Sequence, residues 1–400
     1  MKPNQIILLT ALVVAVGVGG LVLNRKQAQT WGGGSAAGEK LLARLPVGEE
    51  LAHISIQKGT NALTLEKQGD LWTVRERGGY AVNFADLSSA IIKLRDLQPV
   101  QTETVGASQL GRLELLPPGA GSNTATRVEF RDASGKVLET LLLGKTQMRE
   151  EKQAAQFGGG EMGGFPVGRW VMVSDARDKA SLVADPLANL VANPGHWLSK
   201  EFIKVDKIKS IHVQHPEATN SWLVSRTNET SSDWTLADVK AGEVLDTGKT
   251  SGFSYALSNP TFNDVAINAD SAALGLDRPT TIKIGTFEGF TYTFKVGTKQ
   301  GDDQALAVAV SADLPTERKA GAEEKAEDKA RLDQEFAAHN KALAAKLAAE
   351  KSFEKWTFFV SGWTLEALLK PRSELLQAPP AAASGGSGVT PESSAPAEGN

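Results

Sequence analysis

The chain has 400 residues, of which 41% are hydrophobic. That is enough for two domains with separate cores, since a domain commonly holds about 100 to 200 residues. Its 43 Lys and Arg are balanced by 47 Asp and Glu, for a formal net charge of -4, which argues against nucleic acid as a partner because such binding needs a basic surface. The absence of cysteine excludes disulfides, thiolate metal sites and a cysteine nucleophile.

The first segment of the chain predicts a membrane anchor. Residues 6–23 carry no charge, and a membrane span needs about 20 apolar residues. The core of a cleaved signal peptide is shorter, about 7 to 15 residues, and ends at a small-x-small site, for which Ala28-Gln29-Thr30 is a poor candidate. We expect an uncleaved transmembrane helix within residues 1–26, followed by a linker over 27–49. The positions assigned to the membrane are Ile6, Leu9, Leu12, Val16 and Leu23.

Orientation of this anchor is ambiguous from charge. Lys2 precedes the apolar run, whereas Arg25 and Lys26 follow it. The positive-inside rule therefore favours a cytoplasmic location for the rest of the chain.

Two stretches of the chain repeat a series of landmarks. Both contain short segments of alternating apolar residues, a helix-like stretch that ends at a proline, and further strand-like segments. We therefore predict an α+β fold in which two tandem modules, 50–204 and 205–376, each form a mainly antiparallel sheet with packed helices, after the transmembrane helix. The matching landmarks are Trp72, Pro99, Leu110-Gly111 and Leu143-Gly144 in the first stretch, and Trp234, Pro260, Leu274-Gly275 and Val296-Gly297 in the second.

The first module begins with strand patterns at 51–57, 63–67 and 71–74. Asn83 is the expected N-cap of a helix that carries Leu87, Ile91 and Leu94 and ends before Pro99. Further strands are expected at 126–131, 137–143 and 169–173, with a turn at 132–135 and a short helix near 182–190.

The second module shows the same scheme. The expected strands lie at 208–213, 222–224, 233–236, 280–285, 290–296 and 305–310, and a strand at 356–360 is taken as the equivalent of 170–173. That match requires an insertion over 317–352, after which Leu365, Leu368 and Leu369 would belong to a closing helix.

The insertion has the composition of a long helix. It is rich in alanine and charge, with no proline or glycine between Ala322 and Lys351, and at about 1.5 Å per residue it would extend about 45 Å. Its apolar stripe either meets a partner or a second copy, or packs back onto its own module. The candidate contact residues are Leu332, Phe336, Leu343 and Leu347. The tail over 377–400, made of Pro, Ala, Gly and Ser, is expected to be disordered.

No motif predicts a cofactor, a metal or catalysis. Gly144-Lys145-Thr146 and Gly248-Lys249-Thr250 resemble the end of a phosphate-binding loop, but the required first glycine is replaced by Glu139 and Glu243. The glycines within 157–168 lack a strand-to-helix context, and the five histidines have no metal-ligand spacing. There is no Gly-x-Ser-x-Gly elbow. We expect a non-enzymatic protein.

Several motifs together resemble a bacterial family, the domain of unknown function numbered 4340. They are Ile54-x-Ile56, Leu63-x-Leu65-x-Lys67, Gly69-Asp70-Leu71-Trp72, Leu143-Gly144-Lys145 and the Leu-Gly-Leu-x-x-Pro signature at 274–279. The resemblance covers roughly 50–376. It departs at Leu110-Gly111-Arg112-Leu113, where the proline is displaced to Pro117, and at the charged insertion.

The resemblance implies proteins with one N-terminal anchor in the bacterial inner membrane and the repeats outside the cytoplasm, in the periplasm. Some accompany ABC transporters of the gliding-motility type, and no catalytic residues are established to carry over. We therefore expect a membrane-anchored accessory or scaffold protein whose partner is an integral membrane complex, such as ABC-transporter subunits. The alternative is an extracytoplasmic ligand- or glycan-binding module with a cleft between the two repeats, using exposed aromatics such as Trp222 or Trp363.

Overall fold

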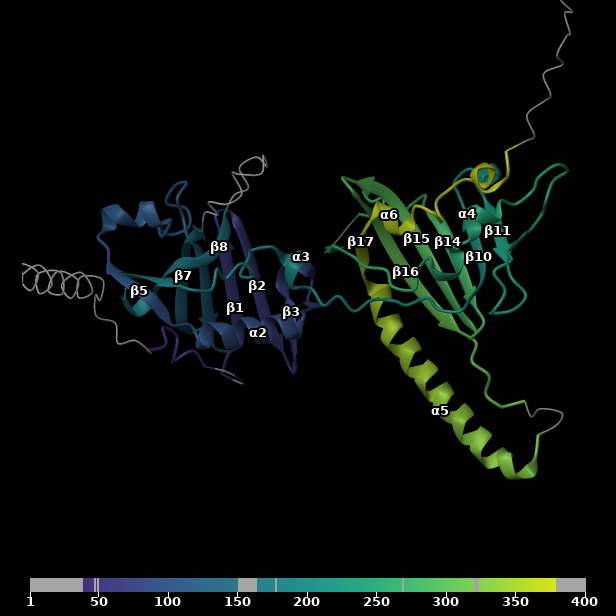
Figure 1. Ribbon diagram of the computed structural model, residues 1–400, viewed down its shortest axis with the longest axis horizontal. Helices are drawn as coiled ribbons and strands as arrows, with labels where there is room; N and C mark the ends of the chain where they lie inside the picture. Colours follow the sequence, from purple (N-terminus) through teal and green to yellow (C-terminus); the bar gives the residue numbers. More distant parts are fainter. Residues whose placement is uncertain are drawn as a thin grey trace, which may run out of the picture. The chain divides into compact units, whose positions relative to one another are not determined.

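The computed structural model describes residues 39–46, 48, 50–149, 164–176, 178–267, 270–319 and 324–378. Their contacts divide them into two compact units (Figure 1). The first contains the described residues up to Phe202, with Thr261–Asp270 and Trp356–Val360. The second contains Ile203–Pro260, Ser271–Lys355 and the described residues from Ser361 onward. Each unit is therefore assembled from separated stretches of chain, unlike the consecutive modules expected from the sequence.

The first sheet has nine strands in the order β4-β3-β2-β1-β6-β7-β8-β9-β5, and all of the paired neighbours run antiparallel. The strands are β1 (His53–Lys58), β2 (Asn61–Gln68), β3 (Leu71–Val74), β4 (Tyr80–Ala81), β5 (Pro99–Thr104), β6 (Thr126–Arg131), β7 (Val137–Arg149), β8 (Phe165–Val173) and β9 (Lys179–Val183).

Alternation of apolar residues sets the buried face of this sheet. Ile54 lies opposite Leu65 and Ile56 opposite Leu63, and all four side chains are buried, because residues two apart on a strand share a face. Helix α2 (Phe84–Arg95) lies against the sheet (Figure 1) and buries Leu87 and Leu94. The predicted N-cap is confirmed, since the side chain of Asn83 accepts a hydrogen bond from the Asp86 backbone N–H.

The second sheet has eight strands in the order β12-β11-β10-β14-β15-β16-β17-β13. The strands are β10 (Ile208–Gln214), β11 (Trp222–Ser225), β12 (Thr235–Leu236), β13 (Asp264–Ala266), β14 (Thr280–Thr286), β15 (Phe290–Gln300), β16 (Asp303–Ala312) and β17 (Thr357–Ser361). The described α-helices besides α2 are α3 (Pro194–Trp197), α4 (Thr247–Thr250), α5 (Ala326–Lys351) and α6 (Gly362–Leu365).

Both sheets repeat one strand order: reading β3-β2-β1-β6-β7-β8-β9-β5 in the first gives β12-β11-β10-β14-β15-β16-β17-β13 in the second. Strand β17 therefore corresponds to β9. The match of 356–360 with 170–173 was wrong, because 170–173 lies in β8, whose counterpart is β16. The long insertion thus occupies the connection between β16 and β17, which corresponds to the connection between β8 and β9 in the first sheet.

Two of the repeated landmarks are sites of close backbone approach. A Cβ atom added to Gly144 in β7 would lie 2.3 Å from the Leu113 carbonyl oxygen, and one added to Gly297 in β15 would lie 2.0 Å from that of Leu274. In both repeats the connection that contains the Leu-Gly landmark crosses a strand at a point where only glycine fits.

The predicted α+β fold class was wrong. The described residues are mainly antiparallel sheet, and among them only α2 and α5 are α-helices longer than four residues. Leu182, expected in a helix, is part of β9, and in the stretch before Pro260 that was expected to be helix-like, Phe253–Tyr255 forms only a 3-10 turn, η6. Short apolar runs of this kind cannot be assigned to helix or strand by spacing alone. The transmembrane helix expected over 1–26 lies outside the described residues, and none of the described helices has both the length and the apolar character needed to span a membrane.

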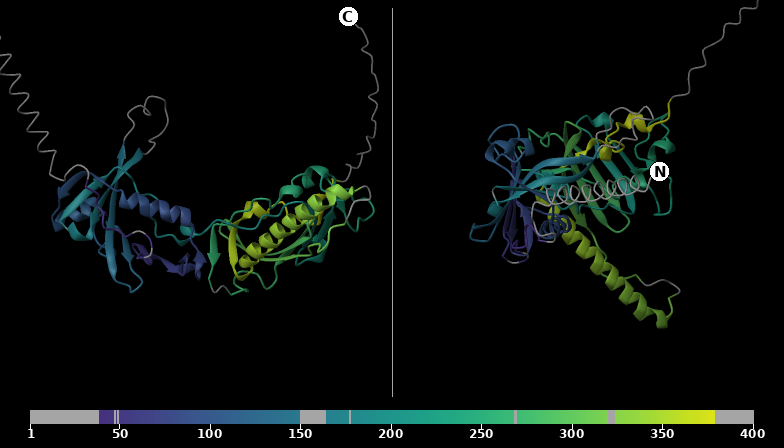
Figure 2. Two further views of the ribbon diagram at one scale, coloured as in Figure 1. Left: turned by 90° about the horizontal axis from the view of Figure 1, so that it is seen from below. Right: turned by 60° about the vertical axis from the view of Figure 1, so that its left-hand side comes forward.

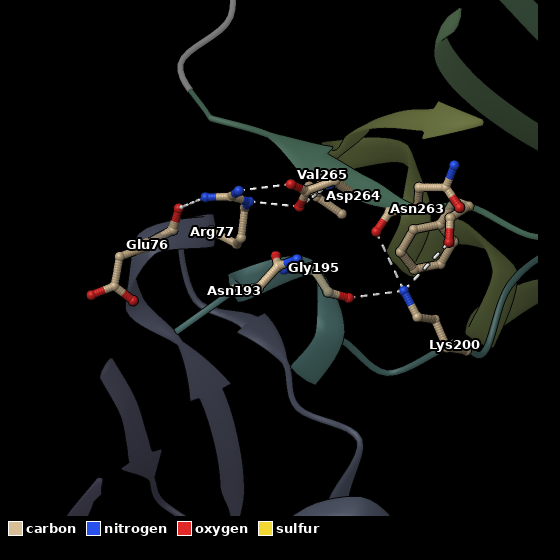
Figure 3. A network of polar contacts seen from close by, with 9 residues as sticks. Glu76, Arg77, Asn193, Gly195, Lys200, Asn263, Asp264 and Val265 are labelled. Atoms are coloured by element: carbon tan, nitrogen blue, oxygen red, sulfur yellow. Dashed lines mark hydrogen bonds and ion pairs between the residues drawn. The ribbon is translucent and has the colours of Figure 1, made fainter. Parts of the chain in front are cut away.

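Strand β13 pairs with β17 at the edge of the second sheet, but its contacts assign it to the first unit, and a polar network holds it there (Figure 3). Arg77, at the end of the 3-10 helix η1 (Arg75–Arg77), donates from Nε and Nη2 to the two carboxylate oxygens of Asp264, at 2.6 and 2.7 Å. The Lys200 ammonium donates to the carbonyls of Gly195, Phe262 and Asn263, at 3.0 to 3.4 Å. These bonds join segments distant in sequence, so the network explains why 261–270 belongs to this unit.

Candidate functional site

Helix α5 is the element that the sequence singled out, and its C-terminal half is fixed to the second sheet. Leu343 is only 7% exposed. The Lys346 ammonium lies 5.2 Å from the centre of the Phe290 ring and 3.8 Å from a carboxylate oxygen of Asp206. Phe290 begins β15, and α5 also contacts the neighbouring strand β16, so the helix packs on strands in the middle of the second sheet.

A buried carboxylate secures the end of the helix. Glu350 is 5% exposed. It accepts hydrogen bonds from the Lys204 backbone N–H at 3.0 Å and from the Tyr292 hydroxyl at 2.9 Å. Burial and the nearby negative charge of Glu350 raise the pKa of Tyr292 well above its ordinary value, so the phenol keeps its proton and remains a donor. Just beyond α5, a carboxylate oxygen of Glu354 accepts the backbone N–H of Val310 in β16 at 2.8 Å.

The N-terminal half of α5 is braced by the segment that precedes the helix. Just past the midpoint of the helix, the Asn340 side-chain amide donates to the Pro315 carbonyl at 2.6 Å. Arg318 donates to Asp333 at 2.8 Å and to both carboxylate oxygens of Glu324. These bonds to Glu324 and Asp333 raise the pKa of Arg318. Pro315 and Arg318 are thereby tied to the side of the helix at Asn340 and Asp333.

The half so braced extends past the ends of the strands of its own unit, as Figure 1 and the right-hand view of Figure 2 show. This half carries two ion pairs between residues one turn apart: Lys329 with Asp333 at 2.5 Å, and Arg331 with Glu335 at 2.7 Å. Such pairs stabilise an isolated helix by about 0.2 to 0.5 kcal/mol each, which suits a helix with few tertiary contacts.

The structure separates the four predicted contact residues. Leu343 is buried against its own unit, so it is not available to a partner, whereas Leu332, Phe336 and Leu347 are half-buried. The C-terminal half of the helix therefore packs back onto its own unit and the N-terminal half extends past the strands, while contact with a partner stays a prediction. Glu350 was missed, although it lies on the stripe of Leu343 and Leu347; an acidic residue at an apolar helical position was the available signal.

The other predicted site residues fall outside this element. Ile6, Leu9, Leu12, Val16 and Leu23 lie outside the described residues. Trp222 was expected to be exposed but is 2% exposed; its indole N–H donates to the Lys370 carbonyl at 2.8 Å, and its ring stacks on Phe253. Trp363 is 72% exposed.

The groups most suited to catalysis have structural partners. In the first unit, burial lowers the pKa of Lys200, but three carbonyls accept hydrogen bonds from its ammonium. Gly144 lies inside β7, and Gly248 lies in α4, where the Asp246 side chain accepts its N–H. Over the part of the chain that the structure describes, no group of three or more His, Asp or Glu is arranged to hold a metal ion.

Comparisons of this chain with protein-family models, with curated proteins and with solved structures return no match. The resemblance to the domain of unknown function 4340 therefore stays a prediction from its motifs.

Proposed function

We propose that this protein is a non-enzymatic accessory or scaffold protein of a membrane complex, and that it contacts an integral membrane subunit through the N-terminal half of α5. The observation that carries the proposal is the division of this helix. Leu343 and Glu350 hold one half in the second unit, while the other half, whose sequence includes the half-buried Leu332 and Phe336, extends beyond the strands. A rigid helix held in one direction binds with less loss of conformational entropy than a flexible one.

The membrane location of the proposal rests on the sequence. The uncharged run 6–23 supports a place at the membrane, and the family resemblance supports an extracytoplasmic orientation and directs the search for a partner to ABC-transporter subunits.

The test is co-purification of the full chain from membranes in a mild detergent. Deleting 317–352 would also remove Leu343 and Glu350, which are buried in the second unit, so the sharper variant is Leu332→Ala with Phe336→Ala. Its matched control on the exposed side of the same helical turns is Gln334→Ala with Ala338→Ser. We expect integral membrane proteins to co-purify with the wild type and the control but to be lost with the double variant.

Recovery of the protein alone, or recovery that the double variant does not change, would contradict the proposed role of α5. Orientation is tested separately by fusing alkaline phosphatase after Lys26, because this enzyme is active only outside the cytoplasm. An inactive fusion would place the units in the cytoplasm and contradict the proposed location.

A further inference from the structure

An open groove of about 810 Å³ lies in the second unit, away from α5. It runs between the turn that joins β15 to β16 and the chain from α6 to the 3-10 helix η8 (Arg372–Leu375). Its volume falls in the range of about 300 to 1,000 Å³ that is usual for small-molecule sites. Trp363 lines it with a ring that is 72% exposed.

Hydrogen bonds and buried side chains hold both walls of the groove in place. On one side, the Gly362 backbone N–H donates to the Asp302 carbonyl at 2.9 Å, which ties the β15–β16 turn to the start of α6. On the other side, the Lys370 carbonyl accepts the indole N–H of buried Trp222. Leu365 and Leu368, which follow Trp363 in the chain, are fully buried. Trp363 is therefore presented to solvent by a rigid backbone.

Hydrogen bonds from Arg372 hold η8 in place. The Arg372 guanidinium donates to Glu243 at 2.6 and 3.2 Å and to the Asp238 carbonyl at 2.8 Å. This fixes the wall that carries Glu374. The site is thus largely formed before any ligand arrives, which lowers the entropy lost on binding.

The polar lining of the groove is mixed in sign. Six of the lining residues have charged or amide side chains, three carboxylates, two ammonium groups and one amide, from Asp302, Glu366, Glu374, Lys299, Lys370 and Gln304. Carboxylates only accept, ammonium groups only donate, and an amide does both. The formal charge of this lining, two ammonium groups against three carboxylates, does not favour an anionic ligand, and its polar side chains do not favour an apolar one.

We propose that this groove binds a neutral saccharide, with one sugar ring stacked on Trp363. A pyranose has a face of C–H groups that packs on the negative face of an indole. Its edge carries hydroxyls that each donate and accept, which matches a lining of carboxylates, ammonium groups and an amide. The proposal is independent of α5 and of the membrane partner, because none of the groove residues belongs to that helix.

The test uses the full chain with indole N–H groups labelled with nitrogen-15, titrated with maltotriose, cellotriose or chitotriose at millimolar concentration. We expect at least one of these sugars to shift the Trp363 resonance, which is assigned by its loss in Trp363→Ala. That substitution should weaken binding, measured by calorimetry, by about tenfold or more, as for other central tryptophan contacts. The matched control is Tyr255→Ala, which removes a 76% exposed ring from the same unit and should leave binding unchanged.

Three results would overturn the proposal. The first is the absence of a Trp363 shift with all three sugars. The second is saccharide binding that survives Trp363→Ala. The third is a shift produced only by co-purified membrane protein, which would make the groove a protein contact instead. Because Trp363 is exposed, loss of its ring is not expected to unfold the unit.

Discussion

Replacing Tyr292 with phenylalanine should loosen the fixed end of α5. The ring of Tyr292 is fully buried, and its hydroxyl donates to Glu350, which is itself 5% exposed. The substitution keeps the ring and removes one of the two donors that hold the carboxylate. Loss of a hydrogen bond to a buried charged group costs about 1.5 to 3 kcal/mol. With a urea dependence of about 2 kcal/mol per M, the midpoint of unfolding of the second unit should fall by roughly 1 M.

Hydrogen exchange as a function of urea measures this midpoint for the second unit alone, through peptides from β15 and from the C-terminal half of α5. The control is Tyr255→Phe, the same chemical change on a ring that is 76% exposed, which should alter stability by less than about 0.5 kcal/mol. In a Glu350→Gln background, Tyr292→Phe should cost only about 0.5 to 1.5 kcal/mol, because the bond lost is then between neutral groups. Equal costs in both backgrounds, or an unchanged midpoint for Tyr292→Phe, would refute the argument.

Three further predictions concern other contacts. The hydrogen bonds from Arg372 lower the pKa of Glu243 from 4.5 to about 2, so the stability that this pair contributes is present above about pH 4.5 and is lost as the pH falls toward 2. The urea midpoint should therefore drop more between pH 7 and about pH 3 in the wild type than in Glu243→Gln. Equal drops in the two proteins would contradict this. Gly297→Ala should destabilise the second unit by about 2 kcal/mol or more, because its Cβ would lie 2.0 Å from a backbone oxygen, whereas Gly252→Ala, with open space around it, should be neutral in the same urea titration. Arg77→Lys cannot make both bonds to Asp264, so amide exchange in β13 should accelerate while exchange in β1 is unchanged; uniform acceleration would point to global destabilisation instead.

Local patterns predicted the parts of the fold whose cause is local. Asn83 caps α2 because its side chain reaches a backbone N–H three residues ahead. The turn at 132–135 forms because Asp132 accepts the backbone N–H groups of Ser134 and Lys136. Alternation placed β1, β2 and β6 because successive side chains on a strand point to opposite faces. None of these features depends on a residue far along the chain.

Pairings between distant segments were not predictable in this way. Strand β5 pairs with β9, with Thr102 opposite Ser181, and the run near 182 was taken for a helix because its partner strand could not be seen in the sequence. The wrong match of 356–360 with 170–173, which lies in β8 and not in β9, has the same cause: strand pairing could not be seen in the sequence. A correct match required the strand order, which is a property of the sheet.

The same division holds for the candidate site. Composition and spacing determined that a long charged helix interrupts the second repeat, since the absence of proline and glycine acts within each turn of the helix. Only the tertiary structure decided which of its apolar residues are accessible. Glu350 is held by Tyr292 and Lys204, and Lys346 lies over the ring of Phe290. These partners are all more than 50 residues away along the chain. The exposure of Trp363 and the burial of Trp222 were likewise set by what packs beside each ring, which a sequence pattern does not contain.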